Sequence, residues 1–163
     1  MRIFFIGTFL ANIIFAFGTL PWMQNTMACH FNAAGQADGF MSPVENAVIM
    51  SIIISFVAFM LGCSGLMIKI AFHKPSWVNI PNRDYWLNDE NRFQTIRRLR
   101  LFMDSMGLWI MAIFLFLQYA TFSANQIVPP ALNSVQLWIV VGTFLMCMFW
   151  DTVRLFSSFR LPK

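Results

Sequence analysis

The sequence predicts an all-α integral membrane protein, a four-transmembrane-helix bundle with both termini in the cytoplasm. Three observations predict this fold. Of the 163 residues, 58% are apolar and only 11% are charged, whereas a soluble domain carries about 25% charged residues. Four apolar runs approach the roughly 20 residues that a helix needs to cross the hydrocarbon core. The basic residues flank these runs in a one-sided pattern.

The predicted membrane domain occupies residues 1–163 as a single unit. The first run ends at Pro21, and no small-residue cleavage site follows, so we expect a retained helix rather than a signal peptide. The second run has a marked start, because Ser42 can cap a helix, Pro43 suits its first position and Glu45 completes a capping-box spacing. The four spans are predicted at 3–21, 44–70, 101–123 and 130–153.

The Lys and Arg residues determine the predicted orientation. Seven of the 11 lie between residues 69 and 100, and the other four lie at residue 2 and after residue 153. The connections 21–44 and 123–134 contain none. Because cytoplasmic loops collect Lys and Arg, we expect the basic loop 71–100 and both termini inside, and the loop 22–43 outside.

Three arginines precede the third span at the expected level of the lipid headgroups: Arg97, Arg98 and Arg100. We expect them to contact anionic headgroups, with docking of an acidic partner as the alternative. The net charge of +4 also raises the question of nucleic-acid binding. The basic residues flank membrane spans, however, so no nucleic-acid partner is expected.

Small residues recur at helical spacing on one face of the second span: Ala47, Ser51, Ser55, Ala58, Gly62 and Gly65. Such residues let a neighbouring helix approach closely in lipid, so we expect a packing seam within the bundle. A homodimer face is the alternative. Asn12, midway in the first span, is expected to form a hydrogen bond between helices, with contact to a substrate as the alternative.

The cytoplasmic loop contains a second set of candidate residues: Asn79, Pro81, Asn82, Tyr85 and Trp86. We expect the paired aromatic rings to lie at the inner interface and to hold the loop against the bundle. Asn88 can cap a helix, which is expected to run unbroken into the third span.

The loop 22–43 is expected to be an ordered cap over the outer helix ends, because Gly35 and Asp38-Gly39 are typical turn residues. His30 is expected to be partly buried and hydrogen-bonded, with Asp38 or a backbone carbonyl as the acceptor. Cys29, His30 and Asp38 also suggest a metal site, but adjacent ligands with one carboxylate are a weak signature, and no metal is expected. The candidate partner-binding or structural residues are His30, Phe31, Asn32, Gly35, Asp38 and Gly39.

Two motifs carry a family resemblance. The first combines Leu20-Pro21, His30-Phe31-Asn32, Gly35 and Asp38-Gly39-Phe40-Met41-Ser42, and the second runs from Asn79 to Leu87 with Glu90 and Arg92. In this order they resemble a family of small bacterial membrane proteins, the domain of unknown function sixteen-forty-eight, over roughly residues 15–92. Ala28-Cys29 stand where many relatives have proline or another residue.

The resemblance implies a multi-pass protein of the bacterial cytoplasmic (inner) membrane. Through the family's immunity and signalling relatives, it also implies a receptor-like or immunity role and no enzymatic activity.

We therefore expect a non-catalytic protein that binds a protein partner, as an immunity or sensor protein or as an accessory subunit, or that forms a homo-oligomer. The sequence contains no nucleophile–base pair, Gly-rich phosphate loop or pair of intramembrane carboxylates, and no cofactor is expected. A small transporter or channel component is the alternative, although few polar residues are available to line a path. An intramembrane enzyme is a third hypothesis, but its two candidate loops lie about 30 Å of hydrocarbon apart.

Overall fold

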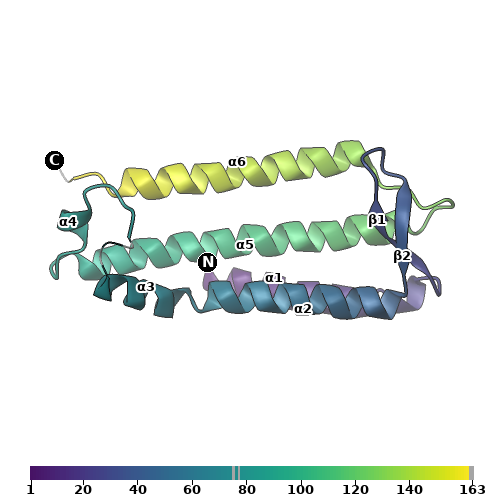
Figure 1. The fold of residues 1–163 in the computed structure, drawn as a ribbon, viewed down its shortest axis with the longest axis horizontal. Helices are drawn as coiled ribbons and strands as arrows, with labels where there is room; N and C mark the ends of the chain where they lie inside the picture. Colours follow the sequence, from purple (N-terminus) through teal and green to yellow (C-terminus); the bar gives the residue numbers. More distant parts are fainter. Residues whose placement is uncertain (75, 77, 162–163) are drawn as a thin grey trace.

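Four long apolar helices lie side by side in the computed structural model, which describes residues 1–74, 76 and 78–161 (Figure 1). They are α1 (Arg2–Gly18), α2 (Pro43–Gly62), α5 (Arg92–Ala124) and α6 (Ser134–Ser158). Each is long and apolar enough to cross a membrane. The predicted count of four such helices is therefore confirmed for the described part of the chain.

The core lies among α1, α2 and α5. Phe5, Ile54 and Met111 contribute one buried side chain from each helix and pack together. Gly107 of α5 makes this contact possible, because a Cβ atom at this position would lie 2.8 Å from the ring of Phe5. The absent side chain therefore lets α1 approach α5 closely, as small residues commonly do in membrane bundles.

The fourth long helix is attached differently. Within the described part of the chain, α6 makes extensive contact with α5 alone, and no residue of α6 is buried. In Figure 1, α6 runs along one side of α5, while α1 and α2 lie on the other side. Most apolar side chains of α6 are thus open to lipid. Contacts at the two ends of α6 therefore help to hold this helix in place.

A two-stranded antiparallel sheet crosses one end of the bundle (Figure 1). The chain leaves α1 through the short helix η1 (Leu20–Trp22), and β1 (Met27–Phe31) then pairs with β2 (Ala37–Met41). The all-α prediction is therefore wrong within the loop 22–43. Strand pairing gives the backbone N–H and C=O groups partners that an irregular loop would have to find elsewhere.

The second predicted span, 44–70, is interrupted. α2 ends at Gly62, and α3 (Ser64–His73) begins after Cys63. Gly62 and Gly65 flank the break, and each destabilises a helix by about 1 kcal/mol relative to Ala. At the other end of α2, Ser42 and Glu45 form the predicted capping box.

The basic loop leads through α4 (Arg83–Trp86) into α5, a single helix of 33 residues. The predicted continuous helix is thus confirmed, but it begins at Arg92 and is not capped by Asn88. The Asn88 side-chain oxygen instead accepts a hydrogen bond from the Asn91 backbone N–H at 2.9 Å, which stabilises a turn before the helix.

The described Lys and Arg residues all lie toward one end of the bundle, which we call the basic end. It comprises the start of α1, the segment from α3 to the start of α5, and the end of α6. Lys163 lies outside the described residues. The opposite end, with β1 and β2, is called the hairpin end.

Candidate functional site

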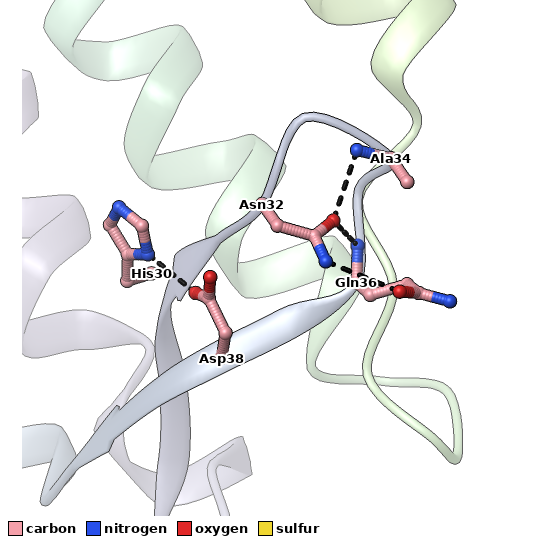
Figure 2. A network of polar contacts seen from close by, with 5 residues as sticks. All are labelled: His30, Asn32, Ala34, Gln36 and Asp38. Atoms are coloured by element: carbon pink, nitrogen blue, oxygen red, sulfur yellow. Dashed lines mark hydrogen bonds and ion pairs between the residues drawn. The ribbon is translucent and has the colours of Figure 1, made fainter.

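The turn of the β-hairpin is built around Asn32 (Figure 2). Its side-chain oxygen accepts hydrogen bonds from the backbone N–H groups of Ala34 and Gln36, both at 3.0 Å. Gly35 adopts a φ of +81°, which a residue with a side chain rarely tolerates. Asn32 and Gly35 are therefore turn residues, as their types predicted. The predicted turn at Asp38-Gly39 is wrong, because both residues lie within β2 and pair with β1.

His30 and Asp38 face each other across the two strands (Figure 2). His30 Nδ1 donates to Asp38 Oδ1 at 2.5 Å, which confirms the predicted acceptor. The prediction that His30 is partly buried is wrong, because the side chain of His30 is 73% exposed and that of Asp38 is 44% exposed. The hairpin holds the pair on its open side, and Gly39 leaves the room for it, since a Cβ there would lie 2.8 Å from the His30 Cβ.

The base of the hairpin is attached to α5. The Asn125 side chain accepts from the Ala28 backbone N–H at 2.7 Å and donates to the Ala28 carbonyl at 2.9 Å. Ala28 is fully buried, and its N–H is a donor that proline lacks. A proline at position 28 would therefore lose the first of these two hydrogen bonds.

The tip of the hairpin is attached to the start of α6. The Leu132 backbone N–H donates to the Gly35 carbonyl at 2.8 Å, and Gln36 forms a bridge with Ala131. The hairpin therefore extends across the end of the bundle from α5 to α6.

Large apolar side chains are exposed around this ordered hairpin. Trp22 after α1 and Phe40 on β2 are 67% and 58% exposed, and Ile127 and Val128 are exposed in the neighbouring connection. Phe31 is half-buried. Exposed apolar groups on an ordered scaffold mark a surface that meets a partner or the membrane interface.

Within the described residues, no three His, Cys, Asp or Glu side chains come together to hold a metal ion. Cys29, His30 and Asp38 consequently do not form a ligand group, although His30 and Asp38 pair.

At the basic end, the loop motif contacts the end of α6. The Trp86 indole N–H and the Asn82 side-chain amide both donate to the Phe159 carbonyl, at 2.8 and 2.9 Å. Trp86 and Phe159 are buried, and the Thr95 hydroxyl donates to the Trp86 carbonyl at 2.6 Å. Because the last carbonyls of a helix lack partners within it, these contacts satisfy the end of α6.

The other members of this motif are more open. Tyr85 is exposed and meets Trp86 edge to face, Asn79 is exposed, and Pro81 is half-buried. The expected contact between the aromatic pair and the bundle is therefore made by Trp86.

Arg98 belongs to the same cluster and has partners within the protein, while its expected contact with lipid stays a prediction. It donates to the Ser158 carbonyl and lies 4.0 Å over the Trp86 ring. A cation at a helix C-terminus is favoured by the helix dipole, and the aromatic face adds a cation–π interaction. Arg97 and Arg100 are exposed, and Arg100 lies over Gly65 of α3.

A family model described as Domain of unknown function (DUF1648) matches residues 3–55. This segment is therefore similar to that family. The matched segment covers about a third of the chain, from α1 through the hairpin to Ser55 of α2. Comparison with curated proteins and with solved structures found no match.

The matched segment therefore includes the hairpin motif, whereas the second motif, at 79–92, lies outside the matched residues. The predicted resemblance to this family is confirmed for the matched segment. Both motifs contact α6, one at each end of that helix, although α6 itself lies outside the matched segment.

Inside the matched segment, the Asn12 side chain is fully buried and joins α1 to α5. It donates to the Met111 carbonyl at 2.9 Å and accepts from the Gln118 amide at 2.7 Å. The predicted interhelical hydrogen bond is thus confirmed. Because Asn12 and Gln118 bind each other, they do not line an open path.

The small-residue seam of α2 is only partly formed. Ala47 is buried and Ala58 packs against the core, while Ser51 is half-buried. Ser55 is exposed, and a Cβ at Gly62 would meet no atom within 4 Å. The predicted seam is therefore not closed at Ser55 and Gly62, which line a hollow beside α1, whereas Ile54 makes the close contact with α1 and α5.

One polar cluster was missed by the sequence analysis. Asp151 Oδ2, on α6, accepts hydrogen bonds from the Ser105 hydroxyl and, at 3.1 Å, from the Trp109 indole of α5. A carboxylate within an apolar helix is itself a signal of a site, but its partners lie more than 40 residues away in sequence.

Proposed function

We propose that the protein is a non-catalytic bacterial inner-membrane protein that binds a protein partner through its hairpin end. In this proposal the basic end faces the cytoplasm and the hairpin end faces the outside, where a partner outside the cell or within the same membrane can reach it. The immunity, sensor and accessory-subunit roles all require a surface of this kind.

The observation that carries the proposal is an exposed apolar surface on an ordered scaffold. Phe40 and Trp22 are open, although the hairpin is held by hydrogen bonds to Asn125 and Leu132. A pre-ordered surface loses little conformational entropy on binding, and aromatic residues supply much of the energy at protein interfaces.

The exposed His30–Asp38 pair adds polar chemistry to the same surface. One ring nitrogen of His30 is engaged by Asp38, so the other remains available to a partner. Because an exposed pair contributes only about 0–1 kcal/mol to stability, its placement favours recognition over folding.

Site-specific photo-crosslinking in native membranes tests the proposal. A crosslinking amino acid at Phe40 should give a discrete protein adduct, whereas the same amino acid at Phe156, which is 44% exposed near the basic end, should not. An adduct of twice the chain mass would identify a second copy as the partner.

The variant Asp38→Asn provides the specificity control. It should weaken the adduct at position 40 and leave the thermal unfolding of the chain nearly unchanged. Equal adducts at positions 40 and 156, or an adduct at 40 that consists only of lipid, would overturn the proposal.

A further inference from the structure

A hollow of about 400 Å³ lies between α5 and α6 near the basic end. Small-ligand sites commonly fall in the range of about 300–1,000 Å³. Its lining combines basic, acidic and apolar groups, the main ones being Arg98, Arg154, Asp151, Leu101, Phe102 and Leu155. The hollow is far from the hairpin and plays no part in the proposed partner binding.

Only one of the two carboxylate oxygens of Asp151 accepts hydrogen bonds from described residues. Asp151 Oδ2 accepts from Ser105 and Trp109, but Oδ1 has no donor among the residues that the structure describes. No Lys or Arg in the described chain lies within 4.0 Å of this carboxylate. An ionised carboxylate offers about four acceptor positions, and leaving them unmatched beside hydrocarbon is costly.

The basic groups lie toward the end of α6. Arg154 follows Asp151 by three residues, so both lie on one side of the helix. Arg154 forms no hydrogen bond or ion pair with any described residue, whereas Arg98 is held in place by Ser158 and Trp86. Two guanidinium groups that line one hollow favour a phosphate, which accepts several N–H donors at once.

We propose that this hollow binds a phosphoethanolamine group, as found in a phospholipid with a primary amine. The phosphate accepts hydrogen bonds from Arg154 and Arg98, and the ammonium group turns inward to donate to Asp151 Oδ1. Leu101, Phe102 and Leu155 contact the apolar part of the lipid. The trimethylated amine of phosphatidylcholine has no N–H to donate to Asp151. Phosphatidylglycerol has no amine, so the Asp151 carboxylate would lie near a phosphate with no cation between them.

The test is thermal unfolding of the full chain in mild detergent with added lipids of identical acyl chains. Phosphatidylethanolamine should raise the unfolding temperature more than phosphatidylcholine or phosphatidylglycerol. Soluble glycerophosphoethanolamine, which has the headgroup but no acyl chains, distinguishes a free headgroup from an intact lipid as the ligand. If it raises the unfolding temperature by itself, the headgroup is sufficient for binding. If it has no effect while phosphatidylethanolamine stabilises the protein, the acyl chains contribute to binding. Equal effects of the three lipids would overturn the proposal.

Two variants and a control assign the roles. Arg154→Gln should lower the apparent affinity for phosphatidylethanolamine about tenfold or more, the change expected for one charge-assisted hydrogen bond. Asp151→Asn should abolish the preference for the primary amine. Arg97→Gln removes an exposed arginine outside the hollow and should change neither.

An equal loss of affinity in Arg97→Gln and Arg154→Gln would reduce the effect to surface charge and refute the site. If Asp151→Asn does not fold, Arg154→Gln still decides the question, because Arg154 is exposed and without a protein partner. Crosslinking at Phe40 should be unaffected by Arg154→Gln, so the two proposals fail independently.

Discussion

The Trp86 indole donates a hydrogen bond to the Phe159 backbone carbonyl at 2.8 Å, across 73 residues of sequence. This contact joins the basic loop to the end of α6, a helix that packs mainly along α5 in the described structure. Together with Gly35 and Leu132 at the hairpin end, it holds α6 at both ends. The position of α6 is thus determined by two loop motifs as well as by helix packing.

Trp86→Phe should lower the free energy of unfolding by about 0.5–1.5 kcal/mol, because the indole donor is lost while the ring is largely retained. Equilibrium unfolding in mixed detergent micelles measures this change. Tyr85→Phe is the matched control and should stay within about 0.5 kcal/mol, since Tyr85 is exposed and its hydroxyl has no hydrogen bond in the described chain. Equal effects of the two changes would argue against the cap on α6.

Gly35→Ala should release the start of α6. The left-handed conformation costs a non-glycine residue about 1–2 kcal/mol, and the new Cβ would overlap the Leu132 carbonyl oxygen and lie 2.8 Å from the Ser134 hydroxyl. Amide hydrogen exchange should increase at 131–134. Gly142→Ala, on the open face of α6, meets nothing within 4 Å and should leave exchange there unchanged.

Gly107→Leu should separate α1 from α5, because even a Cβ at this position would lie 2.8 Å from Phe5. Gly62→Leu should leave the monomer intact, since nothing lies within 4 Å of its Cβ position. Thermal unfolding and size-exclusion chromatography measure both effects. If Gly62→Leu unfolds the monomer, α2 packs through its small-residue face after all; if it changes only the oligomeric state, that face contacts a second copy.

Asn12 and Gln118 should be energetically coupled. A double-mutant cycle with Asn12→Ala and Gln118→Ala should give a coupling free energy of about 0.6 kcal/mol and at most about 1.7 kcal/mol, the range for hydrogen bonds between membrane helices. A coupling near zero in unfolding titrations would show that each amide finds another partner when the first is removed.

Reporter fusions test the orientation. Fusions after residues 38 and 128 should report outside, and fusions after residues 85 and 163 should report inside. The reason is that Lys and Arg residues collect in the cytoplasmic segments of membrane proteins. An inside signal at residue 38 would reverse the topology and remove the hairpin from the outer surface.

Features that depend on neighbouring residues were predictable. The capping box of Ser42 and Glu45 and the turn at Asn32 and Gly35 each involve residues within four positions, so side-chain chemistry and spacing were sufficient. The strands beside this turn were missed because each has only five residues and no clear alternation of apolar and polar side chains. The exposure of His30 was also missed, because it depends on which side of the hairpin faces the bundle.

Contacts between distant segments were not predictable from the same patterns. Arg98 was assigned to lipid because it lies in a basic cluster, and the pattern gave no sign that it also contacts Ser158 and Trp86. Asp151 gave a signal as a carboxylate in an apolar helix, but Ser105 and Trp109 become its partners only when α5 and α6 are aligned in register.

The sequence by itself determined that this chain forms four apolar helices, that its basic residues gather at one end and that two loops carry turn and capping motifs. These properties depend on hydropathy, charge and spacing along short segments. Only the tertiary structure decided that Ile54 rather than Gly62 faces the core, that both loops hold α6, and that Arg98, Arg154 and Asp151 share one hollow. The rotation and register of each helix bring such groups together, and these depend on packing between segments far apart in the chain.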